Sequence, residues 1–175
     1  DLAVIKCKNY THQTRYQLPI PPSPNLPNMK SIYLYPSTCF FEATPVSLGR
    51  GTSLPFQVYG HPNMTGYNYS FTPRSIPGAK NPPQLNKLCH GVDLSNMSDE
   101  EIWKRGVDLT YVIDAYRNLN LDDHFFRSFF ELLVGKDYVR KMIKEGKSAD
   151  DIKAMWKGDV EKFKAQRKPY LLYEE

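Results

Sequence analysis

The chain has 175 residues, of which 41% are hydrophobic and 24% charged, so it is long and apolar enough for one packed domain and unlike a disordered segment. Its net charge is only +4, and acidic residues interrupt the densest basic stretch, residues 136–168, which argues against a nucleic-acid-binding surface. No apolar run approaches the roughly 18 residues of a membrane helix. The three cysteines, Cys7, Cys39 and Cys89, lack metal-ligand spacing, and either one disulfide or three free thiols fits them.

The first half of the chain is predicted to consist of loops and short strands. It starts at Asp1, without methionine, in a strand-like run from Leu2 to Lys8, so we expect a fragment whose upstream part and export signal are missing. Thirteen of the 14 prolines precede residue 98, and proline is confined to turns, edges and loops. The predicted elements in chain order are an extended loop at 19–27, a short apolar segment at 29–35, and strands at 56–59, 68–72 and 87–94. The segment at 29–35 fits a helix or a strand, and a helix that ends before Pro36 is favoured.

The second half is predicted to be helical. Ser98 and Glu101 form a capping-box pattern that opens a helix to about Leu119, although Gly106 leaves a gap in its apolar face. A second helix, rich in phenylalanine, is capped by Asp122 or Asp123 and ends at Gly135. A short helix is expected at 137–145, and a longer one from Ser148 to Pro169. The buried stripe expected on the last helix comprises Ile152, Met155, Trp156, Val160 and Phe163.

These elements predict an α+β fold, in which a small mixed sheet with loops from the first half is covered by three to four C-terminal helices. The aromatic residues of the helices should be buried against the sheet. The set expected to be buried comprises Phe125, Phe129, Phe130, Trp156 and Phe163.

Two residues in the loop-rich half are candidates for chemistry. Glu42 follows two phenylalanines, and an apolar setting would raise the pKa of its carboxyl group as in a general acid. The alternative is that Glu42 caps a helix or pairs with Arg50. Arg50 lies in the turn Gly49–Thr52, where glycines let the backbone approach a ligand and a guanidinium can bind a carboxylate through two hydrogen bonds. The alternative for Arg50 is a plain turn with a solvated side chain.

The other polar residues carry weaker signals. Cys89 and His90 are adjacent in a predicted strand, so their side chains point to opposite faces and cannot form a nucleophile–base pair. His12, His61 and His124 are scattered without metal-ligand spacing, so no metal site and no cofactor is expected.

Six stretches in order resemble a bacterial family once known only as a domain of unknown function and now associated with exo-β-N-acetylmuramidase activity. Ala43 stands where glycine is expected in this family and Ser37 where glycine is common, and both replacements are small for small. The matching stretches are Pro22–Pro27, Tyr35–Thr44, Ser47–Phe56, Tyr59–Pro62, Leu88–Val92 and Arg167–Tyr173.

The resemblance implies a function and a domain organisation. It implies that residues 1–175 are the C-terminal domain of a two-domain glycoside hydrolase, whose upstream Rossmann-like domain holds further residues needed for the reaction. That reaction removes N-acetylmuramic acid from the non-reducing end of peptidoglycan fragments, in a cleft of which this chain would form one wall. The isolated chain is then expected to be inactive, and the whole protein periplasmic or secreted.

The same resemblance suggests residue roles. Glu42 is the candidate catalytic carboxyl group or an organiser of the site, and Arg50 the candidate partner of the lactyl carboxylate of the muramic acid. The further residues expected to bind the substrate are Asn25, Ser37, Thr38, Gly51 and Thr52. A non-catalytic cell-wall binding module is the main alternative, and a nucleic-acid-binding protein is disfavoured by the dispersed charge.

Overall fold

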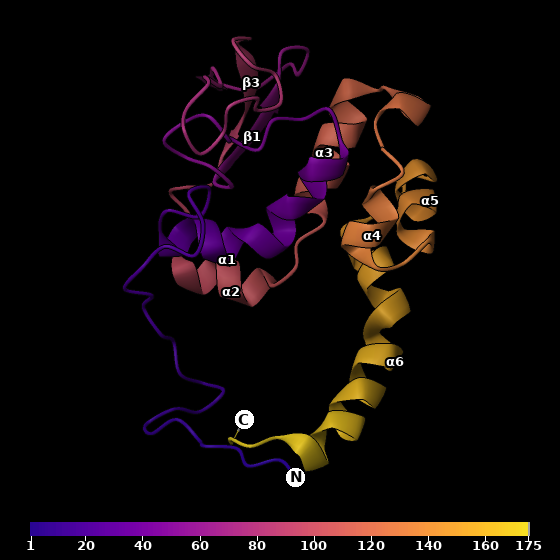
Figure 1. The fold of residues 1–175 in the computed structure, drawn as a ribbon. Coiled ribbons are helices and arrows are strands. Elements are labelled where there is room, and N and C mark those ends of the chain that lie inside the picture. Colours follow the sequence, from indigo (N-terminus) through magenta and orange to yellow (C-terminus); the bar gives the residue numbers. More distant parts are fainter. Residues whose placement is uncertain (175) are drawn as a thin grey trace.

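A three-stranded antiparallel sheet and the helices between residues 29 and 152 form the body of the protein in the computed structural model, which describes residues 1–174 (Figure 1). The strands are β1 (Val58–His61), β2 (Tyr69–Phe71) and β3 (Cys89–Asp93). β3 lies in the centre, with Gly60 opposite Gly91 in β1 and Ser70 opposite His90 in β2. The predicted strands at 68–72 and 87–94 are confirmed, and that at 56–59 begins two residues later. The sheet is antiparallel throughout and not mixed.

Six α-helices and three 3₁₀ helices complete the described chain. The α-helices are α1 (Met29–Thr38), α2 (Asp99–Arg105), α3 (Thr110–Leu119), α4 (Phe130–Val134), α5 (Tyr138–Lys144) and α6 (Ala149–Arg167). The 3₁₀ helices are η1 (Cys39–Ala43), η2 (Asp122–His124) and η3 (Lys168–Tyr170). Together with the sheet they confirm the predicted α+β class. In residues 1–174, no helix combines the length and the apolar character that a bilayer-spanning segment requires.

α1 continues beyond its predicted end and includes Pro36. Proline removes one backbone donor from a helix, so the last turn needs other hydrogen bonds. The Thr38 hydroxyl donates to the Leu34 carbonyl at 3.0 Å, and the Cys39 N–H donates to the Tyr35 carbonyl. These bonds let the chain pass from α1 directly into η1.

The single helix predicted from Ser98 to Leu119 is wrong, because Gly106 divides it into α2 and α3. Gly106 has a φ of 61°, a conformation that glycine adopts without steric cost. The hydroxyl of Ser37 in α1 donates to the Gly106 carbonyl at 3.1 Å and accepts from the Asp108 N–H at 2.9 Å. The break is therefore fastened to α1 by one side chain.

The phenylalanine-rich helix is also shorter than predicted. The chain forms η2 and a turn before α4, and Arg127 donates its N–H to the Ala43 carbonyl of η1 at 2.9 Å instead of to a helical carbonyl. Phe125 and Phe130 are fully buried, as predicted, and Phe126 packs against both, with ring centroids 4.8 and 4.5 Å away. Phe129, by contrast, is 46% exposed, so its predicted burial is wrong.

α6 begins at Ser148 as predicted, with a capping box to Asp151, but most of its apolar stripe is not buried. Ile152 is completely buried and anchors the first turns in the core, whereas Trp156 is only partly buried. Beyond these turns the helix projects away from the body (Figure 1). The predicted burial of Met155, Val160 and Phe163 is therefore wrong.

The first 22 residues contain no strand. The predicted strand from Leu2 to Lys8 is an exposed segment without regular structure, because no neighbouring strand in the described chain offers it backbone partners. The segment returns to the C-terminal tail, where the Cys7 N–H donates to the Tyr173 hydroxyl at 2.8 Å. The rings of Tyr10 and Tyr173 also meet edge to face, 4.8 Å apart.

Candidate functional site

Glu42 lies in η1, directly after the end of α1. Its neighbours Phe40, Phe41 and Ala43 are buried in the main core, where Phe41 stacks on Tyr59 of β1 at a centroid distance of 4.8 Å. A 3₁₀ helix has three residues per turn, so buried residues on both sides leave Glu42 at the surface. Its side chain is accordingly 29% exposed, while the residues on either side are packed in the core.

Arg50 lies at the tip of a tight turn that two glycines shape. Gly49 and Gly51 have φ values of 79° and 82°, in the left-handed region. Thr52 closes the turn, because its N–H and its hydroxyl both donate to the Gly49 carbonyl, at 3.0 and 2.7 Å. The Gly51 carbonyl accepts from the Arg74 N–H at 2.8 Å, which ties the turn to the next loop.

The structure brings Glu42 and Arg50 together. The Arg50 Nη1 lies 3.8 Å from the Glu42 Oε1, which is an ion pair but too long for a hydrogen bond. In the described part of the chain, the Nε of Arg50 is buried and has no hydrogen-bond partner. The Arg50 side chain as a whole is 35% exposed, so its terminal Nη groups, and not the buried Nε, are the donors that an anionic ligand can reach.

Burial raises the pKa of the Glu42 carboxyl group above its ordinary value, and the charge of Arg50 opposes this rise. The structure thus agrees with both interpretations of Glu42, since its carboxyl group has a raised pKa and also pairs with Arg50. Burial, with a smaller effect of the same carboxylate, raises the pKa of the Cys39 thiol to about 11. Burial and the nearby Cys39 and Glu42 also raise the pKa of the Tyr35 hydroxyl. Tyr35 is partly exposed, so the site presents an aromatic hydroxyl, a carboxyl group and a guanidinium on one surface.

The other predicted substrate-binding residues already have internal partners. The Ser37 hydroxyl joins α1 to the α2–α3 break, and the fully buried Thr38 hydroxyl bonds the Leu34 and Phe56 carbonyls. The Asn25 side-chain amide donates to the Gly78 carbonyl at 2.9 Å. Burial of Ser37 and Thr38 favours a scaffold role for both hydroxyls over direct contact with a sugar.

Gly51 and Thr52 act through the backbone of the turn. A Cβ atom added at Gly51 would lie 2.4 Å from the Arg74 carbonyl oxygen, so the position accepts no side chain. The Thr52 hydroxyl also accepts from the Leu54 N–H at 3.0 Å. These two residues thus set the position of Arg50.

Sequence reasoning missed a carboxylate on α3. The Oδ2 of Asp114 accepts hydrogen bonds from the hydroxyls of Tyr59 and Tyr67, both at 2.8 Å. Burial and this carboxylate raise the pKa of both tyrosine hydroxyls, which therefore stay protonated and donate. Tyr59 is the ring that stacks on Phe41, so the network braces the core beneath Glu42. The sequence places Asp114 in a predicted helix, but it gives no sign of the two tyrosines that bind its carboxylate.

The histidines and cysteines do not form a metal centre in residues 1–174, where no group of three or more metal-ligating side chains occurs. Cys7, Cys39 and Cys89 are free thiols. Cys89 is buried while His90 faces the other side of β3 and contacts the Ser70 hydroxyl at 2.9 Å, so the predicted separation of the Cys89–His90 pair is confirmed.

These features define an α+β domain in which a partly desolvated carboxyl group and a guanidinium form an ion pair between neighbouring backbone elements. The chain belongs to the C-terminal family of the exo-β-N-acetylmuramidases, because the family described as "Exo-beta-N-acetylmuramidase NamZ, C-terminal" matches residues 33–173. The resemblance seen in the sequence is thus confirmed.

Relatives of this chain are about twice its length. The peptidoglycan beta-N-acetylmuramidase NamZ of Bacillus subtilis (strain 168) is 33% identical over 99% of this chain and 46% of its own. A DUF1343 family protein from Bacteroides fragilis, known from its crystal structure, shares 81% sequence identity with this chain. The two structures superpose with a TM-score of 0.98, over 100% of this chain and 50% of the B. fragilis chain. A second B. fragilis DUF1343 protein shares the fold, at 21% identity and a TM-score of 0.61, over 89% of this chain and 45% of its own. The chain therefore spans about half the length of the relatives it matches.

Proposed function

We propose that this chain is the C-terminal part of a peptidoglycan exo-β-N-acetylmuramidase and forms one wall of its active-site cleft. Membership of the family supports the general activity. The observation that carries the proposal for this chain is the pairing of Glu42 with Arg50 at 3.8 Å, with both side chains about one third exposed (29% and 35%). The substrates are muramic-acid saccharides derived from peptidoglycan, and the enzyme acts in the periplasm or after secretion, where peptidoglycan lies.

Arg50 is the recognition residue in this proposal. N-acetylmuramic acid differs from N-acetylglucosamine by a lactyl group that ends in a carboxylate, and a planar guanidinium binds a carboxylate through two parallel hydrogen bonds. The glycine-framed turn holds Arg50 outward with its backbone fixed at both ends. Little conformational entropy then remains to be lost when the ligand carboxylate binds.

Glu42 supplies one carboxyl group at the same surface. Glycoside hydrolysis generally uses two carboxyl groups that face the scissile bond, and a general acid needs a raised pKa. Burial raises the pKa of Glu42, which suits an acid or a group that orients the acid. In the described chain, Arg50 is the charged group that acts on the pKa of Glu42, so the second carboxyl group comes from the remaining half of the polypeptide, a Rossmann-like domain upstream.

An activity assay of the isolated chain tests whether the catalytic groups are divided between two domains. A chromogenic N-acetylmuramic acid glycoside should be hydrolysed by the full-length polypeptide and not by residues 1–175, because the isolated chain offers only one wall. Turnover by the isolated chain at a rate near that of the full-length protein would contradict the two-domain account. Binding of muramic-acid saccharides without hydrolysis by either protein would instead identify a cell-wall binding module.

A further inference from the structure

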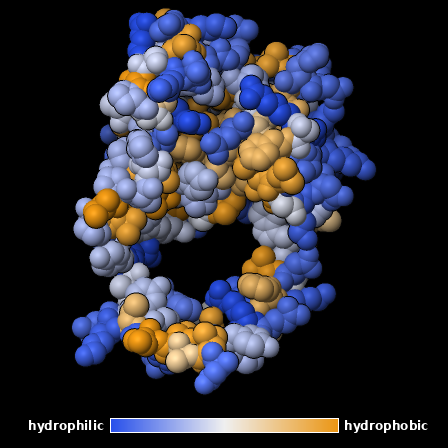
Figure 2. Space-filling model, viewed as in Figure 1, coloured by the Kyte–Doolittle hydropathy of each residue, from blue (hydrophilic) through white to orange (hydrophobic). Residues whose placement is uncertain are grey.

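Two arms project from the body of the protein and meet at their tips. One is the N-terminal segment of residues 1–22, and the other is α6 with the C-terminal tail (Figure 1). Their contact includes the Cys7 N–H bond to the Tyr173 hydroxyl and a backbone bond from the His12 N–H to the Glu174 carbonyl at 3.0 Å. Figure 2 shows that the arms and the body enclose an opening through the molecule.

The arms give the chain more surface than a folded monomer of its size normally has. A 20.2 kDa globular protein is expected to expose about 8,800 Å². The accessible surface here is 11073 Å², an excess of about 2,300 Å². Interfaces between domains of one chain bury about 600–1,500 Å². The excess is therefore large enough to be the uncovered half of an interdomain interface.

The N-terminal arm contains a strand sequence without a sheet. Leu2 and Ile5 are 85% and 96% exposed, and Val4 is also exposed. Aliphatic residues of this kind favour a strand, but an unpaired strand is unstable in water. The disagreement between sequence and structure at residues 2–8 is explained if the backbone partners of this segment lie outside the described chain.

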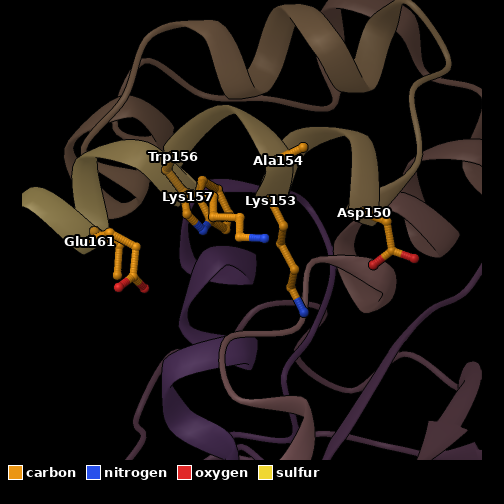
Figure 3. Close-up of a pocket in the computed structure, with 7 residues that line it drawn as sticks. Asp150, Lys153, Ala154, Trp156, Lys157 and Glu161 are labelled. Atoms are coloured by element: carbon orange, nitrogen blue, oxygen red, sulfur yellow. The ribbon is translucent and has the colours of Figure 1, made fainter.

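The second arm carries a helical stripe without a partner. Trp156, Val160 and Phe163 recur at the spacing of one helix face, in line with the buried Ile152, yet Val160 and Phe163 are 42% and 61% exposed. Figure 3 shows Trp156 beside Lys153 and Lys157 on the wall of a shallow groove of about 390 Å³ along α6. Figure 2 shows hydrophobic residues bordering the opening on the side of α6.

A second apolar groove continues this surface onto the body. It has a volume of about 420 Å³, and Trp156 and Val160 line it together with Cys39 and Phe40 of η1 and Leu133 of α4. Cys39 and Phe40 lie three and two residues before Glu42 of the candidate site. A partner that covers the α6 stripe would thus also reach the edge of the candidate site.

We propose that the two arms clamp the half of the polypeptide that the relatives carry before this domain. Residues 2–8 pair as an edge strand with a sheet of that companion domain, and the α6 stripe packs against its apolar surface. This inference rests on the two-domain organisation of the proposed function. The occupant follows from the family description, which makes the matched part C-terminal, and from the relatives, of which this chain covers about half.

Amide hydrogen exchange tests the clamp by comparing the full-length polypeptide with residues 1–175. In the isolated chain, the amides of residues 3–6 should exchange at nearly the unprotected rate. In the full-length protein they should be slowed by at least about 100-fold, because paired strand amides exchange only when the structure opens. Equal, fast exchange in both proteins would overturn the edge-strand pairing.

A matched pair of variants in the full-length protein tests the α6 stripe. Phe163→Asp places a charge in the proposed interface and should abolish most of the protection of residues 3–6. Ala165→Asp adds the same charge two residues along, on the opposite face of the helix, and should leave the protection unchanged. Equal protection in the two variants would overturn the role of the stripe.

Two further measurements distinguish a lost clamp from a lost fold and from a lost activity. Melting of the isolated chain with Phe163→Asp should be unchanged, because this side chain is exposed there, so a lost fold is detected directly. Muramidase turnover by the full-length protein is measured in parallel. Protected arms without turnover would refute the proposed function and leave the clamp intact, whereas turnover with unprotected arms would refute the clamp alone.

Discussion

Gly51→Ala should disrupt the turn that presents Arg50, and Gly66→Ala is its matched control. Both glycines have nearly the same φ, 82° and 83°, so alanine meets the same left-handed backbone cost of about 1–2 kcal/mol at each. A Cβ atom at Gly66 has no heavy atom within 4 Å, whereas at Gly51 it would lie 2.4 Å from the Arg74 carbonyl oxygen and 3.1 Å from the Arg74 nitrogen. These contacts are backbone atoms and cannot rotate away.

The difference between the two variants isolates the steric term. We expect Gly66→Ala to cost about 1–2 kcal/mol and Gly51→Ala about 2–5 kcal/mol, because an overpacked site adds a further 1–3 kcal/mol or so. For a chain of this length, that difference of about 1–3 kcal/mol corresponds to a gap of about 2–12 °C in Tm. Urea and thermal unfolding of the isolated chain measure both quantities. Equal losses in the two variants would refute the reasoning that crowding by Arg74 fixes the turn.

The pH dependence of stability and the reactivity of the thiols provide two further tests. Because the pKa of Glu42 is raised in the folded state, its contribution is most favourable below the ordinary value of 4.5 and is lost as pH rises through the folded-state pKa. Glu42→Gln should therefore gain Tm relative to the wild type between about pH 4 and 7, and a constant gap would contradict this. At pH 8, Ellman's reagent should label Cys7 quickly and Cys39 and Cys89 slowly, because burial raises the pKa of the latter two to about 11. Three equally fast thiols would contradict the structure.

Local signals in the sequence predicted much of the fold. The Ser148 capping box and the glycine-framed turn at Arg50 depend on contacts within a few residues, and both are found in the structure. The strand predicted at 68–72 is found as well, although its backbone partners lie about 20 residues away in β3. The break at Gly106 depends instead on the Ser37 hydroxyl, 69 residues away, which no local pattern reveals. The Arg127 bond to Ala43 that shortens the phenylalanine-rich helix is likewise a long-range contact.

The candidate site was predictable in its members but not in its geometry. The sequence singled out Glu42 and Arg50 and left their pairing open as one alternative, and the structure shows them 3.8 Å apart. The Asp114 network was missed because its two tyrosine partners lie on other segments, 55 and 47 residues away. The sequence predicted the apolar stripe of α6 correctly, but its burial is complete only at Ile152, because the helix projects from the body beyond its first turns.

The selectivity of an Arg50 variant tests the central claim most directly. In the full-length polypeptide, Arg50→Ala should lower kcat/KM for an N-acetylmuramic acid glycoside by about 2–4 kcal/mol, or roughly 30- to 900-fold, as expected when one partner of a desolvated charge pair is removed. Activity on the N-acetylglucosamine analogue should fall much less, because that sugar has no lactyl carboxylate, and Arg50→Lys should restore only part of the loss. Equal losses on both substrates, together with a lower Tm, would contradict the recognition role and leave Arg50 as a scaffold partner of Glu42.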